Sequence, residues 1–282
     1  MTSSADHGQP SRSSAGPSLG EKIALALSRR EVWISLGFLV LFLAIWEWLP
    51  PLAKIPPYIL PPISAVFKEF FRLLHVENLF LHTGLTLIEV IIGFVLGSLL
   101  GMVVGYALGL SPMLEFVLSP YILALQITPK VAFAPLFIMW LGYTVYPKIL
   151  VAILIVFFPV LINVLSSVRT IDPAMINLAR SFSASRAQIF WKIEFPASMP
   201  NLFAGLRIGS TLAVIGIVVG ELVGGNKGLG YLLVLGEGQG NTAMVFVTII
   251  LLTVIGILAY LAVILAERRV LHYMPERQIG PV

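Results

Sequence analysis

The stretch DPAMINLARSFSASRAQIFWKIEFPASMP, residues 172–200, decides the fold, because it is the long amphipathic, charged segment between two long apolar runs. Asp172 followed by Pro173 predicts a helix start, since a carboxylate caps free backbone N–H groups and proline has the φ of a first helical residue. Residues 174–182 then follow a helical pattern. We therefore expect a first short helix here, outside the lipid.

A second short helix is predicted at 186–193. The serine cluster at 183–185 separates it from the first, because serine hydroxyls compete for backbone hydrogen bonds and favour turns. Pro196 is expected to prevent a simple continuation of the second helix. The resulting helix–turn–helix carries three cations, Arg180, Arg186 and Lys192. Such an element, attached rigidly to two membrane spans, suits the transmission of force from a soluble partner.

The composition places the chain in a membrane. Hydrophobic residues make up 58% of the chain and charged residues only 11%, whereas about a quarter of the residues of a soluble domain are charged. Only a bilayer accommodates such repeated apolar runs. We predict an all-α membrane protein with about six transmembrane helices, at 31–49, 83–110, 114–141, 148–165, 202–223 and 243–266. The chain has no cysteine, which excludes disulfides and thiolate metal sites.

These spans divide the chain into four segments. We expect a disordered cytoplasmic tail at 1–30, and the first span with an external connection at 31–82. A core domain at 83–270 contains the 172–200 loop, and a second cytoplasmic tail occupies 271–282. Lysine and arginine number four in the first tail, four in the loop region 169–192 and three from residue 268 onward, against five in the opposite segments. This excess predicts that both termini and the loop are cytoplasmic.

Two further patterns concern packing. The external connection contains an amphipathic helix, 65–74, which we expect Ser64 to cap. Its apolar side would consist of Val66, Phe67, Phe70, Phe71 and Leu74. The second span has a glycine every four residues, which gives one smooth face for close helix–helix approach: Gly93, Gly97, Gly101 and Gly105. The sequence leaves open whether this face packs within one subunit or forms a dimer seam.

The 172–200 stretch resembles the cytoplasmic EAA loop of permease subunits of ABC importers. That pattern is Glu-Ala-Ala, three residues, Gly, nine residues and Ile-x-Leu-Pro. Here Asn177-Leu178-Ala179, Ser183 and Ile193-Glu194-Phe195-Pro196 have the same spacing. Other stretches are similar to the permeases for sulfonate, taurine, nitrate and related solutes: Leu60–Val66, Thr128–Gly142, Ser167–Pro173, Gly205–Gly224 and Gly228–Leu233. The similarity covers about residues 33–275.

The resemblance implies the membrane subunit of a type I ABC importer, in a bacterial inner membrane. Two ATPase subunits would hold ATP and Mg, so this chain would bind no cofactor itself. A second copy of the permease would complete the pathway, and an extracytoplasmic solute-binding protein would deliver a small organic or anionic solute for alternating access. The ATPase would dock on Asn177, Leu178, Ala179, Arg180, Ser181, Ser183, Ala184 and Ser185.

The third predicted span is interrupted at Thr128-Pro129-Lys130. Proline removes a backbone hydrogen bond, and such a break is tolerated in a membrane where it faces protein or a water-filled path. An ammonium at this depth is costly, which indicates a functional or paired position. We assign Thr128, Pro129, Lys130 and Glu221 to a translocation path or gate. Lys130 could stabilise an anionic solute by its charge, or it could snorkel or pair with Glu221, since the two come within about one turn in depth. Glu221 could form part of an outer gate, belong to that pair, or be hydrated at the outer interface.

Other function classes find less support in the sequence. The chain has no GxxxxGK[ST] run and no HExxH or paired-carboxylate spacing, so we do not expect it to hydrolyse ATP or to be a membrane enzyme. The sequence contains no basic run with interleaved aromatics, so we do not expect a nucleic-acid partner. A self-contained channel or an ion-coupled carrier remains the alternative to the importer. The sequence does not name the solute.

Overall fold

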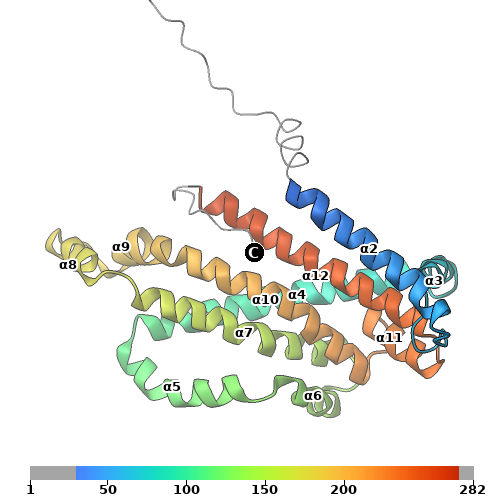
Figure 1. Ribbon diagram of the computed structural model, residues 1–282. Helices are drawn as coiled ribbons and strands as arrows, with labels where there is room; N and C mark the ends of the chain where they lie inside the picture. The colour runs from blue at the N-terminus through green and yellow to red at the C-terminus, as the bar shows by residue number, and fades with distance from the viewer. Residues whose placement is uncertain (1–29, 273–282) are drawn as a thin grey trace, which may run out of the picture. The chain divides into compact units, whose positions relative to one another are not determined.

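The computed structural model describes residues 30–272, and every regular element in this range is helical (Figure 1). The tails predicted at 1–30 and 271–282 lie almost entirely outside the described residues. The chain divides into two compact units, Met1–Pro56 and Pro57–Val282. The amphipathic helix of the external connection therefore belongs to the same unit as the core.

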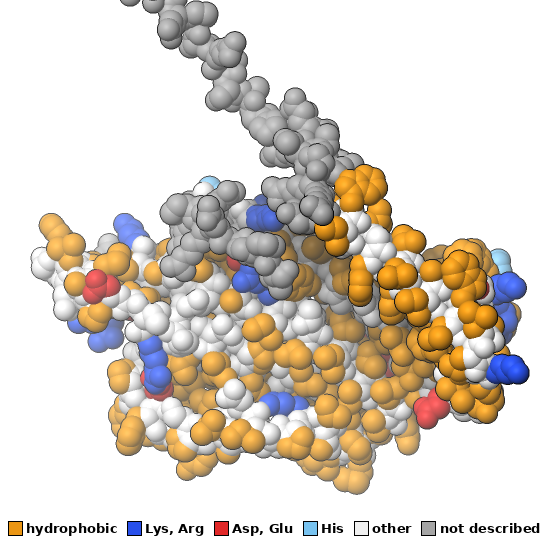
Figure 2. All heavy atoms as spheres, in the orientation of Figure 1, with side chains coloured by type: hydrophobic (Ala, Val, Ile, Leu, Met, Phe, Trp, Pro, Cys, Tyr) orange, Lys and Arg blue, Asp and Glu red, His pale blue; other side chains and the backbone are white. Residues whose placement is uncertain are grey.

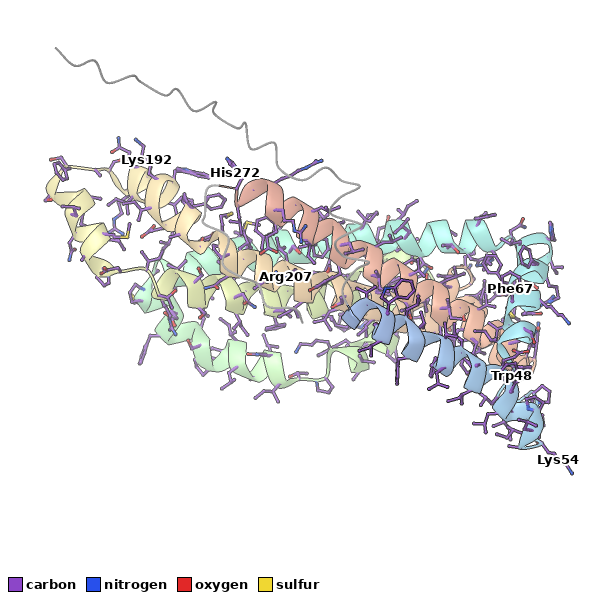
Figure 3. The ribbon with its side chains drawn as sticks, turned by 45° about the horizontal axis from the view of Figure 1, so that its top comes forward. Trp48, Lys54, Phe67, Lys192, Arg207 and His272 are labelled. Carbon is purple, nitrogen blue, oxygen red and sulfur yellow. The ribbon has the colours of Figure 1, made fainter. Side chains whose placement is uncertain are left out.

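The first unit contains one described helix, α2 (Arg30–Leu52). It extends through Pro50 and Pro51, beyond the end predicted at residue 49. Proline has a helical φ, and its missing N–H disturbs a helix least near an end. The backbone N–H of Ala53 still reaches the carbonyl of Leu49, at 2.8 Å, and closes the last turn. Trp48 and Lys54 lie at this end of α2 (Figure 3).

The second unit is a helical bundle. Its elements are α3 (Ile63–Val76), α4 (Leu79–Gly109), α5 (Pro112–Ile127), the 3-10 helix η1 (Lys130–Phe133), α6 (Ala134–Leu141), α7 (Val145–Arg169), α8 (Pro173–Ser181), α9 (Arg186–Ile189), the π-helical turn η2 (Phe190–Glu194), α10 (Phe195–Gly224), α11 (Leu229–Gly238) and α12 (Thr242–Val270). With α2 included, five described helices are long and apolar enough to cross a membrane, or six if the bent pair α5 and η1–α6 is one span. This confirms an all-α chain with about six spans.

The bundle has two distinct ends. Helices α8 and α9 lie at one end with the end of α12, and α3 and α11 lie at the other (Figure 1). Lys192 and His272 mark the first end and Phe67 the second (Figure 3). Charged side chains gather over α8–α9 and over α3, and hydrophobic side chains cover much of the surface between them (Figure 2). Such a distribution fits helices that run through lipid between two wet ends.

Helix α3 begins earlier than predicted. Its N-cap is Pro62, in an extended conformation, and Ser64 lies already inside the helix. The Pro62 carbonyl accepts the first helical bond, from Ala65 N–H, at 3.0 Å. The predicted apolar side is split, because Val66 is buried whereas Phe67 is 65% exposed. The inner half packs on the bundle and the outer half is left for lipid.

Glu69 attaches α3 to the start of α12. Its carboxylate accepts a hydrogen bond from Arg72 at 2.6 Å and one from the amide of Asn241 at 2.7 Å. The Arg72 guanidinium, helped by Asn241, lowers the pKa of the Glu69 carboxyl against the opposing effect of burial. Asn241 also caps α12, because its side-chain oxygen accepts the N–H of Met244. This corner holds the external helix on the bundle.

The core of the bundle is α7, packed between α4 and α10. The glycines of α4 face α7: a Cβ added at Gly93 would lie 2.6 Å from the Ala152 Cβ. Glycine also lines the other side, where a Cβ added at Gly216 would lie 2.6 Å from the Ala152 Cα. The glycine face of α4 therefore packs within the subunit, which decides the question that the sequence left open.

A buried ion pair joins the same helices. The Lys148 ammonium of α7 contacts both carboxylate oxygens of Glu89 on α4, at 2.8 and 3.1 Å. Their side chains are only 7% and 6% exposed. Gly220 of α10 allows this approach, since a Cβ there would lie 2.6 Å from the Lys148 Cα. Such a pair is tolerated because each charge compensates the other where water cannot.

Gly101 tests the α4–α7 packing. An alanine Cβ there would lie 2.6 Å from the carbonyl oxygen of Phe157, which is backbone and cannot rotate away. We expect Gly101→Ala to lower stability by about 1–3 kcal/mol, seen as a lower melting temperature in detergent. Gly84→Ala on the same helix is the control, because nothing lies within 4 Å of its added Cβ. Equal melting temperatures for the two variants would contradict this packing.

The Glu89–Lys148 pair is tested by a double-mutant cycle. Glu89→Met or Lys148→Met alone leaves one buried charge without its partner, which costs about 3–5 kcal/mol. The double variant removes both charges, so we expect it to recover most of that loss. Thermal unfolding of the four proteins in one detergent measures the coupling. Additive effects of the two substitutions would show that the residues do not interact.

Candidate functional site

The hairpin formed by α8 and α9 has helix caps at both starts. The Asp172 carboxylate accepts the N–H of Ala174 at 2.8 Å, with Pro173 in the first turn, as the sequence predicted. Ser185 starts α9 with a capping box: its hydroxyl accepts the Gln188 N–H, and the Gln188 side chain accepts the Ser185 N–H. These caps satisfy N–H groups that have no helical partner. Each short helix therefore has a defined start without support from the bundle.

Ser183 forms the turn between the two helices in the left-handed region, with φ of 59°. The Ala184 N–H bonds back to the Ala179 carbonyl at 3.0 Å and closes the end of α8. Glycine adopts this conformation most easily. The turn thus explains why the family pattern has glycine where this chain has Ser183.

The hairpin presents apolar side chains away from the bundle. Along α8 and its C-cap, Met175, Leu178 and Phe182 are 52%, 61% and 80% exposed. Their spacing of three and four residues puts them on one face of the helix. Among the other predicted docking residues, Ala179 and Ala184 are half-buried, and the rest are exposed: Asn177, Arg180, Ser181, Ser183 and Ser185. An exposed apolar face outside the spans is typical of a protein contact.

The second helix of the hairpin does not stop at Pro196, which corrects the sequence prediction. The helical run continues from Arg186 to Gly224 over 39 residues. A π turn makes this possible, because the Phe195 N–H bonds to the Phe190 carbonyl, five residues back. Pro196 then falls in the first turn of α10, where its missing N–H is not needed. The second helix of the hairpin is therefore continuous with α10.

An aromatic cluster joins this π turn to the end of α4. The Tyr106 ring centroid lies 5.4 Å from that of Phe190 and 5.9 Å from that of Phe195. The Tyr106 hydroxyl also shares a hydrogen bond with the Ser198 hydroxyl of α10. The base of the hairpin is therefore in contact with α4 as well as continuous with α10.

The third predicted span is broken where the sequence indicated. Helix α5 ends at Ile127, and η1–α6 continues at an angle of 82° to it. The Thr128 hydroxyl bonds to the Ala124 carbonyl at 2.8 Å and closes the end of α5. Pro129 follows with an extended backbone and starts η1. Thr128 and Pro129 therefore form the corner, and Lys130 is the first residue beyond it.

A cavity of about 450 Å³ lies beside this corner. It is lined by α7 and α10, near the middle of both helices, and by α5 and Lys130. Its polar residues are Gln126, Lys130 and Asn163, and six others are apolar. The Lys130 ammonium donates to the Gln126 carbonyl and lies 4.7 Å from the centroid of the Phe158 ring.

Lys130 and Glu221 do not form an ion pair, and Glu221 does not lie at the surface. Glu221 is only 1% exposed. Its carboxylate accepts the Thr86 hydroxyl at 2.7 Å and the Gly230 N–H at 2.6 Å. Neither the pair nor a surface position for Glu221 is therefore correct, because the segment after α10 folds back over Glu221.

Three successive backbone N–H groups of this segment bind side chains of α4 and α10. Gly228 donates to Nδ1 of His82 at 3.0 Å, Leu229 to the Thr86 hydroxyl at 2.8 Å, and Gly230 to Glu221. We call residues 228–230 with His82, Thr86 and Glu221 the outer clasp. It fastens the loop between α10 and α11 to the end of α4 opposite the hairpin.

Sequence reasoning missed several polar residues of the bundle. His82 was assigned to a connection, and Glu89 and Lys148 were not singled out, although all three are buried. The signal was present, since charged residues inside apolar spans mark polar contacts. Their partners lie 59 and 146 residues away in the chain, at Lys148 and Gly228. Only the packing of α4 against α7 and α11 reveals them.

Comparison with known proteins identifies the family of this helical bundle. A family described as "Binding-protein-dependent transport system inner membrane component" matches residues 93–272. The riboflavin transport system permease protein RibX of Chloroflexus aurantiacus is 39% identical, over 87% of this chain and 92% of its own. The putative aliphatic sulfonates transport permease protein SsuC of Bacillus subtilis is 33% identical, over 87% of this chain and 89% of its own.

A solved structure shares the architecture. The MetNI methionine ABC transporter, in inward-facing conformations, superposes with a TM-score of 0.60 at 19% identity, over 69% of this chain and 98% of that one. This likeness supports the fold of a type I importer membrane subunit. The chain is accordingly a multi-pass inner-membrane protein, and it belongs to the ABC transporter permeases of the binding-protein-dependent transport family.

Proposed function

We propose that this chain is the permease subunit of an ATP-driven importer and that it moves a small organic or anionic solute into the cytoplasm. The observation that carries the proposal is the exposed apolar face of α8, with Leu178 and Phe182, which the turn at Ser183 joins to a helical run from Arg186 through α10. Apolar side chains in water at the end of a rigid rod suit a docking site for another protein. The partner would be an ABC ATPase with ATP and Mg bound.

The assembly contains two copies of this permease, two ATPases and an extracytoplasmic solute-binding protein. The hairpin end of the bundle faces the cytoplasm together with both termini, as the distribution of lysine and arginine indicates. The outer clasp and α3 face the other side, where the binding protein delivers the solute. Residues 177–185 contact the ATPase, with Leu178 and Phe182 as the apolar anchors.

The transport cycle is alternating access. Closure of the ATPases on ATP draws the two hairpins together, and each hairpin moves α10 directly and α4 through Tyr106. Because α4 and α10 approach α7 closely at their glycines, the three helices move as one body. The path opens outward, receives the solute and returns it inward after hydrolysis. Thr128, Pro129 and Lys130 line this path at the corner of the broken span, and Glu221 acts as part of the outer clasp.

Docking through α8 is tested by Phe182→Asp. A carboxylate in place of an exposed ring would have to be buried in the ATPase interface, so we expect co-purification with a co-expressed cognate ATPase to fall by at least about tenfold. Phe67→Asp is the matched control, since Phe67 is 65% exposed at the opposite end of the bundle. Its ATPase binding should equal that of the unaltered protein.

The turn supplies a second variant of the same site. Ser183→Gly suits the φ of 59° and should keep the ATPase bound, whereas the β-branched Ser183→Val is strained there and should lose it.

Coupled transport that persists in Phe182→Asp would contradict docking through this face. Full transport by the purified chain alone, without an ATPase, would identify a self-contained channel or carrier instead.

A further inference from the structure

We propose that the cavity beside Lys130 is an anion-selective half-site, which takes the acidic head group of a small organic solute with an apolar body. This inference rests on the proposed transport function and adds the chemical class of the solute to it. The carboxylate, sulfonate or phosphonate of the solute would bind the Lys130 ammonium. The hydrocarbon part would lie against Ile155, Ile162 and Leu212 of the cavity wall.

The first argument is the lack of a carboxylate partner for Lys130. Other cations of the bundle interior have one: Lys148 binds Glu89 at 2.8 Å, and Arg207 binds Glu267 at 2.9 Å. Lys130 is in none of the ion pairs formed within residues 30–272. A charge in low-dielectric surroundings is expensive without a counter-charge. Lys130 is half-buried beside an open cavity, so water or an anion can reach its ammonium.

The second argument is the composition of the cavity. Lys130 is its only charged lining residue, and Gln126 and Asn163 are the only other polar ones. Asn163 already donates to the Pro159 carbonyl at 2.8 Å, so one of its amide hydrogens is engaged within α7. The Lys130 ammonium has three N–H groups, and the Gln126 carbonyl accepts one bond from it. Donors are left for an incoming anion, and no carboxylate lines the wall to repel it.

The third argument is geometry. The break at Thr128–Pro129 turns Lys130 back over the end of α5, and the Phe158 ring of α7 holds the ammonium at 4.7 Å. Irregular backbone at this depth persists where it lines a cavity. The α5 carbonyls reduce the local positive charge but carry only partial charges. A net cation therefore faces the cavity near the middle of α7 and α10.

The chain contains no cysteine, so a single introduced thiol reports on this cavity alone. Ile208 lines the cavity and is 49% exposed, and we choose Ile208→Cys as the reporter. The full chain in nanodiscs is treated with two methanethiosulfonate reagents of similar size, one with a sulfonate and one with a trimethylammonium group. The ratio of their reaction rates measures the local potential at the thiol.

We expect Lys130→Gln to lower the anion-to-cation rate ratio at Ile208→Cys by at least about tenfold, because a unit charge acts strongly at short range in a medium of low dielectric. Lys130→Arg keeps the charge and should keep the ratio. Gln239→Cys is the control thiol: Gln239 is exposed beyond the end of α11, and its ratio should not respond to Lys130. Melting temperatures verify that each variant folds.

Two results would overturn the half-site. The ratio at Ile208→Cys does not change in Lys130→Gln, or neither reagent reacts there while Lys130 is present. Leu212→Cys, a second lining position, repeats the measurement in case the first substitution disturbs packing. The assay needs no ATPase and no solute-binding protein. The half-site can therefore be disproved while ATPase docking at α8 stands. Docking can likewise be disproved while the half-site stands.

Discussion

The close approach of three helices at Ala152 is the constraint on which the rest of the structure depends. Gly93 of α4 and Gly216 of α10 face Ala152 of α7 from two sides, and a Cβ added at either would lie 2.6 Å from it. Backbones this close leave no space for one helix to shift against another. The three spans therefore form one body, and motion at one end of it must appear at the other.

Most of the charged groups buried in the bundle have a partner on another element. Glu89 forms an ion pair with Lys148, and Arg207 forms one with Glu267. The Glu221 carboxylate accepts hydrogen bonds from the Thr86 hydroxyl and the Gly230 N–H. Each contact joins different helices, or a helix and the loop that follows it, so the polar groups add specificity to an apolar bundle. Lys130 differs because no carboxylate of the described residues pairs with it, and it faces a cavity.

In the proposed cycle, the ATPase and the solute contact this body at different places. The hairpin is continuous with α10 through the π turn, and the Tyr106 cluster connects it to α4. The cavity lies along α7 and α10, farther from the hairpin, and the outer clasp lies at the opposite end. A displacement of α8 can therefore reach both the cavity wall and the clasp without unfolding any element. This arrangement is the physical basis of the proposed cycle.

The sequence by itself determined the features that depend on local chemistry: the apolar spans, the break at Pro129, the Asp172 cap and the turn at Ser183. These features depend on composition or on a side chain's effect on adjacent backbone, so they can be predicted without knowledge of the fold. Only the tertiary structure decided that the α4 glycines pack on α7, that Glu221 lies in the clasp rather than beside Lys130, and that the hairpin runs on past Pro196. These outcomes depend on contacts between residues far apart in the chain, or on a shift in helical register that no local pattern encodes.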